Sequence, residues 1–121
     1  MPPLMRVFLI AALAVGLAAC GGSGSGGGQV ASSEACPSGA VTIHMKDVKF
    51  DPPRATAKAG QSVCWANDDT VDHDAVADSG ASFKSALFGK GKTFTTKLDK
   101  PGTVKYACTI HPGMTGEITV K

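Results

Sequence analysis

Three side chains with soft donor atoms stand close together near the end of the sequence. The segment YACTIHPGM places Cys108, His111 and Met114 at intervals of three residues. A tight loop through Pro112-Gly113, between two strands, can aim the thiol, the imidazole and the thioether at a single point. A lone buried cysteine is more often a small hydrophobic residue than a ligand, but this spacing indicates a metal site.

A thiolate, an imidazole and a thioether form a soft donor set, unlike the carboxylates that magnesium and calcium require. Copper fits this set best, because a blue-copper site takes two histidines and a cysteine with a weak, long axial methionine. Zinc could occupy the same donors. The second histidine must come from outside the loop. His73 follows an expected strand and can lie at the same end of the fold, whereas His44 is on the polar side of a strand and is expected to be solvated.

The elements that would position these residues are strands. Short runs alternate apolar and polar residues between Gly, Pro and Asp, and no segment has a helical period. The expected strands are Val41 to Lys46, Arg54 to Ala59, Ser62 to Asn67, Ala75 to Ala77, Lys92 to Leu98, Thr103 to Cys108 and Thr115 to Val120. Their spacing predicts an all-β fold, a two-sheet antiparallel sandwich with Greek-key connections. Phe83, Leu87 and Phe88 are expected to fold over one end of its core.

The start of the chain indicates export. Residues 1–19 have the pattern of a secretory signal peptide, with Arg6 ahead of an apolar run. The run from Val7 to Ala19 is shorter than the roughly 20 residues needed to cross a bilayer. A permanent membrane span is therefore the weaker alternative.

The end of this signal resembles a bacterial lipobox. In Leu17-Ala18-Ala19-Cys20 the cut would precede the cysteine, which would then carry lipid. The alternative is an ordinary signal cut near Ala19, which leaves Cys20 free. Residues 20–35 would comprise the lipidated cysteine and a flexible tether rich in Gly and Ser, and residues 36–121 a single domain. We expect a membrane-anchored lipoprotein that faces the periplasm or the extracellular side.

The remaining cysteines each need an explanation, because thiols in an oxidising compartment either pair or are held by something else. With Cys20 lipidated, Cys36, Cys64 and Cys108 remain. Cys64 is expected to point away from the main core. A bridge between Cys36 and Cys64 would stabilise the fold by roughly 3.5 kcal/mol on the chain-entropy model and would leave Cys108 unpaired. The alternative is two unpaired thiols that the strands shield.

The charge pattern bears on the partners. The formal net charge is +2 and no run is strongly basic, so nucleic acid is not expected as a partner. Five aspartates crowd one segment, namely Asp68, Asp69, Asp72, Asp74 and Asp78. They form either a solvated acidic loop or a surface that steers a positively charged partner.

From Val41 to Lys121 the sequence resembles the small cupredoxins of the amicyanin and plastocyanin type. The resemblance lies in VTIHMKDVKFDPPRATAKAG, QSVCWANDD and PGTVKYACTIHPGMTGEITVK. The C-x2-H-x2-M spacing is similar to the short amicyanin loop. The resemblance implies one copper ion, alternating between Cu(I) and Cu(II), bound by His73, Cys108 and His111 with Met114 as the axial ligand.

Two residues beside His73 depart from the pattern of these proteins. Asp72 stands where proline is common, and Asp74 stands where asparagine or threonine often supports the cysteine ligand. Asp74 and Asn67 are expected around the ligands, where outer groups tune a metal site. A carboxylate so near the metal favours the oxidised, more positive copper, so Asp74 is expected to lower the reduction potential.

The ligand set predicts function. Three strong ligands and one weak ligand leave no convenient position for a small-molecule substrate, so we expect a monomeric one-electron carrier and not an enzyme. His111, flanked by Ile110 and Pro112, is the expected edge through which electrons pass during brief docking with a donor and an acceptor protein. The alternatives are a protein that buffers or delivers copper, and a metal-free interaction module.

Overall fold

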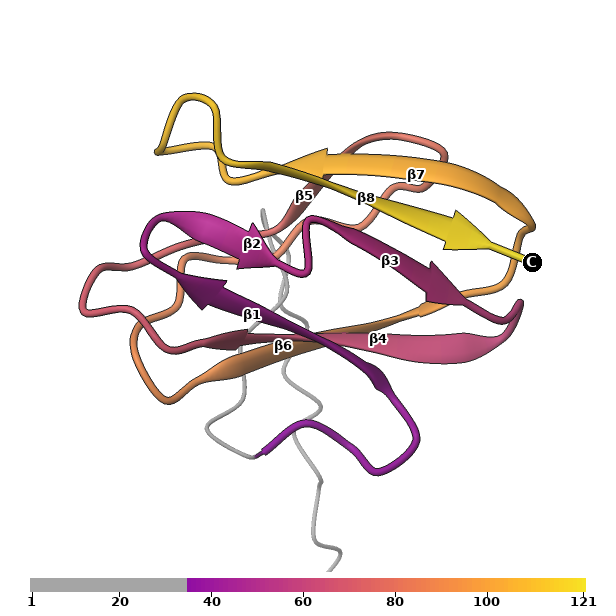
Figure 1. Cartoon of the computed structure of the whole chain (residues 1–121), viewed down its shortest axis with the longest axis horizontal. Coiled ribbons are helices and arrows are strands. Elements are labelled where there is room, and N and C mark those ends of the chain that lie inside the picture. The colour runs from indigo at the N-terminus through magenta and orange to yellow at the C-terminus, as the bar shows by residue number, and fades with distance from the viewer. Residues whose placement is uncertain (1–34) are drawn as a thin grey trace, which may run out of the picture.

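The computed structural model of the chain describes residues 35–121 (Figure 1). The predicted signal peptide, Cys20 and the tether up to residue 34 lie outside these residues. Within residues 35–121 we find no helix long and apolar enough to cross a membrane.

The described residues form two four-stranded sheets that pack face to face. The strands are β1 (Val41–Lys46), β2 (Lys49–Asp51), β3 (Arg54–Ala57), β4 (Gln61–Asn67), β5 (Val76–Ser79), β6 (Thr93–Leu98), β7 (Gly102–Ala107) and β8 (Thr115–Val120). The first sheet has the order β2-β1-β4-β6 and the second the order β3-β8-β7-β5. The predicted two-sheet sandwich is therefore confirmed, and the strands found in both the prediction and the structure differ by at most two residues at each end.

The sheets are mixed, whereas the sequence predicted antiparallel ones. β1 pairs with β4 in parallel, and so does β3 with β8. The cause is the segment Asp51 to Arg54, where Pro52 and Pro53 lack the N–H groups that a ladder needs. The extended chain leaves the first sheet at β2 and joins the second sheet as β3. After a reversal at Gly60, β4 returns beside β1 in the same direction (Figure 1).

The strand β2 was not predicted from the sequence. This strand follows a two-residue turn in which Asp47 and Val48 both have positive φ, 54° and 56°. Asn-Gly or Asp-Gly is the usual pair in such a turn, and a β-branched valine in place of the glycine is rare. Without that glycine, Asp47-Val48 does not predict a hairpin from the sequence.

The core lies between the two sheets and is rich in aromatic rings. The fully buried Trp65 of β4 packs against Tyr106 of β7, with ring centroids 5.2 Å apart, and against Phe94 of β6 at 5.6 Å. Phe83 and Phe88 are buried as predicted, but Leu87 is 51% exposed. The backbone of Phe88 pairs with His73. Because neighbouring residues of an extended chain point to opposite sides, the side chain of Leu87 faces solvent.

A disulfide joins Cys36 to Cys64, with the two Cα atoms 5.7 Å apart. Cys64 lies in the middle of its sheet, between Thr42 of β1 and Thr95 of β6. Its neighbours Val63 and Trp65 belong to the core, so the alternation of side chains along β4 puts the disulfide on the outer face of the sheet. The beginning of the described chain is thereby held against that face.

Candidate metal centre

The predicted site residues meet at one end of the sandwich. His73 lies on the segment between β4 and β5, and Cys108, His111 and Met114 lie on the loop between β7 and β8. In Figure 1 both loops lie at the left end of the molecule, as does the turn between β1 and β2. The ends of β1, β4 and β7 thus bring together segments that are far apart in the sequence.

Three donor atoms form a small triangle. His73 Nδ1 lies 3.1 Å from His111 Nδ1, and Cys108 Sγ lies 3.7 Å from His73 Nδ1 and 3.4 Å from His111 Nδ1. With metal–nitrogen bonds of about 2.0–2.1 Å and a metal–sulfur bond of about 2.3 Å, the donors of a trigonal site stand roughly 3.5–4 Å apart. The observed spacing is close to this, so the three residues fit one small metal ion.

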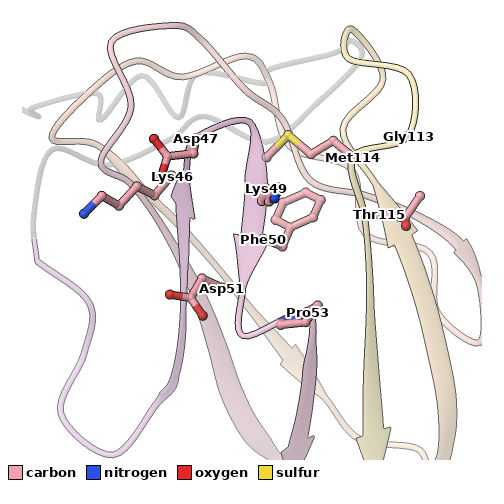
Figure 2. A pocket seen from close by; sticks show the side chains of 9 residues that line it. All are labelled: Lys46, Asp47, Lys49, Phe50, Asp51, Pro53, Gly113, Met114 and Thr115. Carbon is pink, nitrogen blue, oxygen red and sulfur yellow. The ribbon is translucent and has the colours of Figure 1, made fainter.

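Met114 lies on the same loop and is buried. The loop is closed by two backbone hydrogen bonds, from Cys108 N–H to Met114 O at 3.0 Å and from Met114 N–H to His111 O at 3.1 Å. Met114 also lines a shallow groove of about 430 Å³ between this loop and the β1–β2 turn. Figure 2 shows its side chain extending over the groove toward that turn.

The groups around the Cys108 thiol shift its pKa in opposite directions. Burial raises its pKa, and the backbone N–H groups of Asp74 and Ile110, which point to the sulfur, partly offset that rise. The negative charge of the Asp74 carboxylate raises the pKa further. A metal ion must therefore displace the thiol proton when it binds, and the two N–H groups then stabilise the thiolate.

Asp74 and Asn67 both organise the loops that carry the donors. The Asp74 carboxylate accepts hydrogen bonds from the backbone N–H of Thr109, at 2.6 Å, and from its hydroxyl group. It thus joins the segment of His73 to the residue after Cys108. The Asn67 side chain donates to Val71 O at 3.0 Å and to Phe88 O at 2.8 Å.

One group beside a donor ring was not singled out by the sequence analysis. Asp69 Oδ2 lies 2.7 Å from His73 Nε2, the ring nitrogen opposite to the donor atom. Burial alone would raise the pKa of Asp69, but hydrogen bonds from Val48, His73 and Asp47 outweigh it and lower that pKa. Its neighbour Asp68 is half exposed and instead contacts His44 Nδ1 at 2.6 Å. Nothing in the adjacent pair Asp68-Asp69 indicates which carboxylate turns inward.

Exposed apolar side chains, called the apolar rim below, lie on the segments that carry or contact the donor residues. Among residues 35–121 the large apolar side chains that remain exposed are Val48, Val71, Leu87 and Ile110. Each lies on a segment that contacts the site. Ile110 precedes His111, and Leu87 precedes Phe88, which pairs with His73. The backbone carbonyl of Val71 accepts a hydrogen bond from Asn67, and the backbone N–H of Val48 donates one to Asp69.

Comparison with known proteins places the chain in a family. Residues 37–121 match copper binding proteins of the plastocyanin/azurin family. Amicyanin-alpha of Methylorubrum extorquens is 30% identical over 98 residues, covering 78% of this chain and 82% of that protein. Plastocyanin of Scenedesmus fuscus is 37% identical over 84 residues, covering 60% and 86%.

Solved structures agree with this match. An amicyanin mutant in its oxidised state superposes with a TM-score of 0.68 at 26% identity, covering 74% of this chain and 90% of that one. The predicted cupredoxin-like sandwich and copper as its cofactor are therefore confirmed. The chain belongs to the plastocyanin/azurin family of copper-binding proteins.

Proposed function

We propose that the protein is a one-electron carrier whose copper ion is held by His73, Cys108 and His111, with Met114 as a weak fourth ligand. The observation that carries the proposal is the triangle of three donor atoms, in which His73 and Cys108 are buried. Copper supplies the change between Cu(I) and Cu(II) when bound. The protein contributes a site closed by its own side chains, which suits passage of an electron better than binding of a substrate.

The hydrogen bonds around the donors support this role. Asp69 contacts the ring of His73, Asp74 holds the residue after Cys108, and two backbone bonds close the loop of His111. The donors therefore have fixed neighbours without a metal ion. A site that is already arranged moves little when its charge changes, which favours fast electron exchange.

His111 and the apolar rim are the proposed contact surface. A small apolar surface suits brief docking with a donor and an acceptor protein, and Ile110 and Pro112 flank His111 there. Two of the five aspartates, Asp69 and Asp74, are engaged with His73 and Thr109. The remaining three, Asp68, Asp72 and Asp78, are exposed and would steer a positively charged partner.

We also propose that the protein is exported and anchored by lipid at Cys20, with residues 1–19 as the signal peptide, residues 20–35 as the tether and residues 36–121 as the domain. The Cys36–Cys64 disulfide supports export, because disulfides persist in oxidising compartments. In this role the domain is a monomer that exchanges electrons with redox proteins. It has no catalytic activity and no nucleic-acid partner.

The deciding experiment is a visible spectrum after addition of Cu(II), beside a Cys108→Ser control. A thiolate–copper site gives an intense blue band that a mild reductant bleaches and that the control lacks. Rapid one-electron reduction and reoxidation of the blue protein would support electron transfer. A colourless protein that still holds Cu(II) would instead indicate copper handling and overturn the proposal.

A further inference from the structure

The carboxylate of Asp69 contacts nitrogen atoms from two different parts of the chain, the β1–β2 turn and the ring of His73. Its Oδ1 accepts the backbone N–H of Asp47 at 2.9 Å, and its Oδ2 accepts the backbone N–H of Val48 at 2.9 Å. The same Oδ2 lies 2.7 Å from Nε2 of His73. The side chain of Asp69 is 15% exposed and that of His73 is 0% exposed, so the contact between them is shielded from water.

The β1–β2 turn has an unfavourable backbone that this carboxylate offsets. Asp47 and Val48 have φ values of 54° and 56°, which side chains other than glycine rarely adopt. Two successive N–H groups in such a turn point into one concavity, which suits a negatively charged oxygen. Asp69 supplies both of its oxygens there. The two N–H groups also fix the rotamer of Asp69, whose Oδ2 contacts His73.

The contact with Asp69 also determines which nitrogen of His73 is free. An ionised carboxylate accepts hydrogen bonds and donates none, so Nε2 must carry the proton. In the neutral ring Nδ1 is then unprotonated, and it is the atom that lies 3.1 Å from His111 Nδ1 and 3.7 Å from Cys108 Sγ. The ring is thereby held in the tautomer that presents its lone pair to the other two donors.

We propose that Asp69 is the positioning residue of the metal centre: anchored by the N–H groups of Asp47 and Val48, it fixes the ring and the tautomer of His73 before any metal binds. This inference rests on the ligand set of the proposed function. A carboxylate on the far nitrogen of a ligand histidine also makes that histidine a stronger donor. Asp69 therefore connects a strained turn on the surface to the electronic properties of the site.

The test compares Asp69→Asn with Asp68→Asn in the otherwise unchanged protein. The two substitutions remove the same charge from neighbouring positions, but Asp68 contacts His44 and not His73. The first measurement is the long-range ¹⁵N–¹H spectrum of the histidine rings in metal-free protein. We expect His73 to be protonated at Nε2 in the original protein and in Asp68→Asn, and to lose this single tautomer in Asp69→Asn.

The second measurement is the Cu(II) affinity and the reduction potential of the same proteins. Loss of a partner outside the ligand shell typically costs 10- to 100-fold in metal affinity, so we expect a fall of about that size in Asp69→Asn. The reduction potential should rise, because a weaker donor at His73 stabilises Cu(II) less. Asp68→Asn should change neither quantity by a comparable amount.

A role for Asp69 in stability alone must be separated from positioning, and Val48→Gly does so. Glycine tolerates positive φ and keeps the backbone N–H, so it should relieve the turn. If Val48→Gly combined with Asp69→Asn recovers thermal stability but not the tautomer or the affinity, positioning is supported. Recovery of all three, or an unchanged tautomer and affinity in Asp69→Asn, would overturn the proposal. The tautomer is read without copper, so a protein that fails to turn blue refutes the proposed function and leaves this result intact.

Discussion

Nδ1 of His73 and Nδ1 of His111 lie 3.1 Å apart although 38 positions separate the residues in the sequence. Two bare nitrogens at this distance repel each other, and two protonated ones repel more strongly. The pair is therefore satisfied by one shared proton or by one cation. The protein holds the two rings in this arrangement through hydrogen bonds made elsewhere, by Asp69 to the first ring and by the backbone of Met114 to the loop of the second.

Asp74→Asn should raise the reduction potential of the copper protein, because the substitution removes a negative charge that favours the oxidised metal. A unit charge within about 7 Å at an effective dielectric constant of about 20–40 changes the energy by about 1–2 kcal/mol, or roughly 40–90 mV for one electron. Voltammetry of the original protein and of Asp74→Asn measures this difference in reduction potential. The matched control is Asp72→Asn, an exposed carboxylate on the other side of His73, whose smaller effect should fade with added salt. Equal shifts in both variants would refute a specific role for Asp74.

Ile110→Asp should slow electron exchange between two copies of the protein. Ile110 is 46% exposed and precedes His111, so a charge there disrupts apolar contact at the proposed docking surface. NMR line broadening in mixtures of oxidised and reduced protein gives the self-exchange rate. Thr103→Asp places the same charge on the exposed start of β7, away from the loop of His111, and serves as the control. If the control slows exchange as much, net charge and not the rim limits the rate.

Removal of the disulfide should lower the free energy of unfolding by about 3.5 kcal/mol without changing the metal site. The two cysteines are separated by 28 positions, so the bridge constrains a long loop of the unfolded chain. The double substitution of Cys36 and Cys64 by alanine, compared in urea unfolding, measures the change. The visible spectrum of the copper protein should stay the same, since the disulfide lies on the outer face of the sheet. A shifted spectrum would contradict that separation.

The protein should lose stability at alkaline pH as Tyr106 ionises. Burial raises the pKa of Tyr106 to about 12. Neither the Tyr106 hydroxyl nor Trp65 Nε1 has a hydrogen-bond partner within the described residues. Since the pKa in the folded protein lies above the ordinary tyrosine value of 10.0, this contribution is complete below pH 10 and is lost as the pH rises toward 12. A shift of this size corresponds to roughly 3 kcal/mol.

The sequence contains a single tyrosine and a single tryptophan, so tyrosinate absorbance reports on Tyr106 alone and tryptophan fluorescence on Trp65 alone. Tyrosinate absorbance should appear with unfolding, at a midpoint above that of free tyrosine, and Trp65 fluorescence should report the same transition. Tyr106→Phe should remove this part of the pH dependence at little cost, because the hydroxyl makes no hydrogen bond. A tyrosinate midpoint near 10 in folded protein would show that the ring is accessible to water.

The donor residues on the β7–β8 loop could be predicted because they lie close together in the sequence. Cys108, His111 and Met114 follow one another at fixed intervals, and the chemistry of three soft donors points to copper. His73 required one further inference, that two loops meet at the same end. The alternation of apolar residues likewise predicted most strands, since burial of one face follows from a period of two.

The features that sequence analysis missed depend on contacts made only in the folded protein. Alternation does not reveal the direction of a neighbouring strand, so the parallel pairs were not foreseen. The turn at Asp47 and Val48 is allowed by Asp69, a residue far along the chain. The choice between Asp68 and Asp69, and the outward turn of Leu87, likewise follow from backbone pairing that no local pattern specifies.

The position of the disulfide determines how a pulling force would reach the domain. Cys36 is fastened to the middle of β4 on the outer face of its sheet, whereas the apolar rim lies at one end of both sheets. A load applied upstream of Cys36 therefore passes into the centre of a sheet and bypasses the loops of His73 and His111.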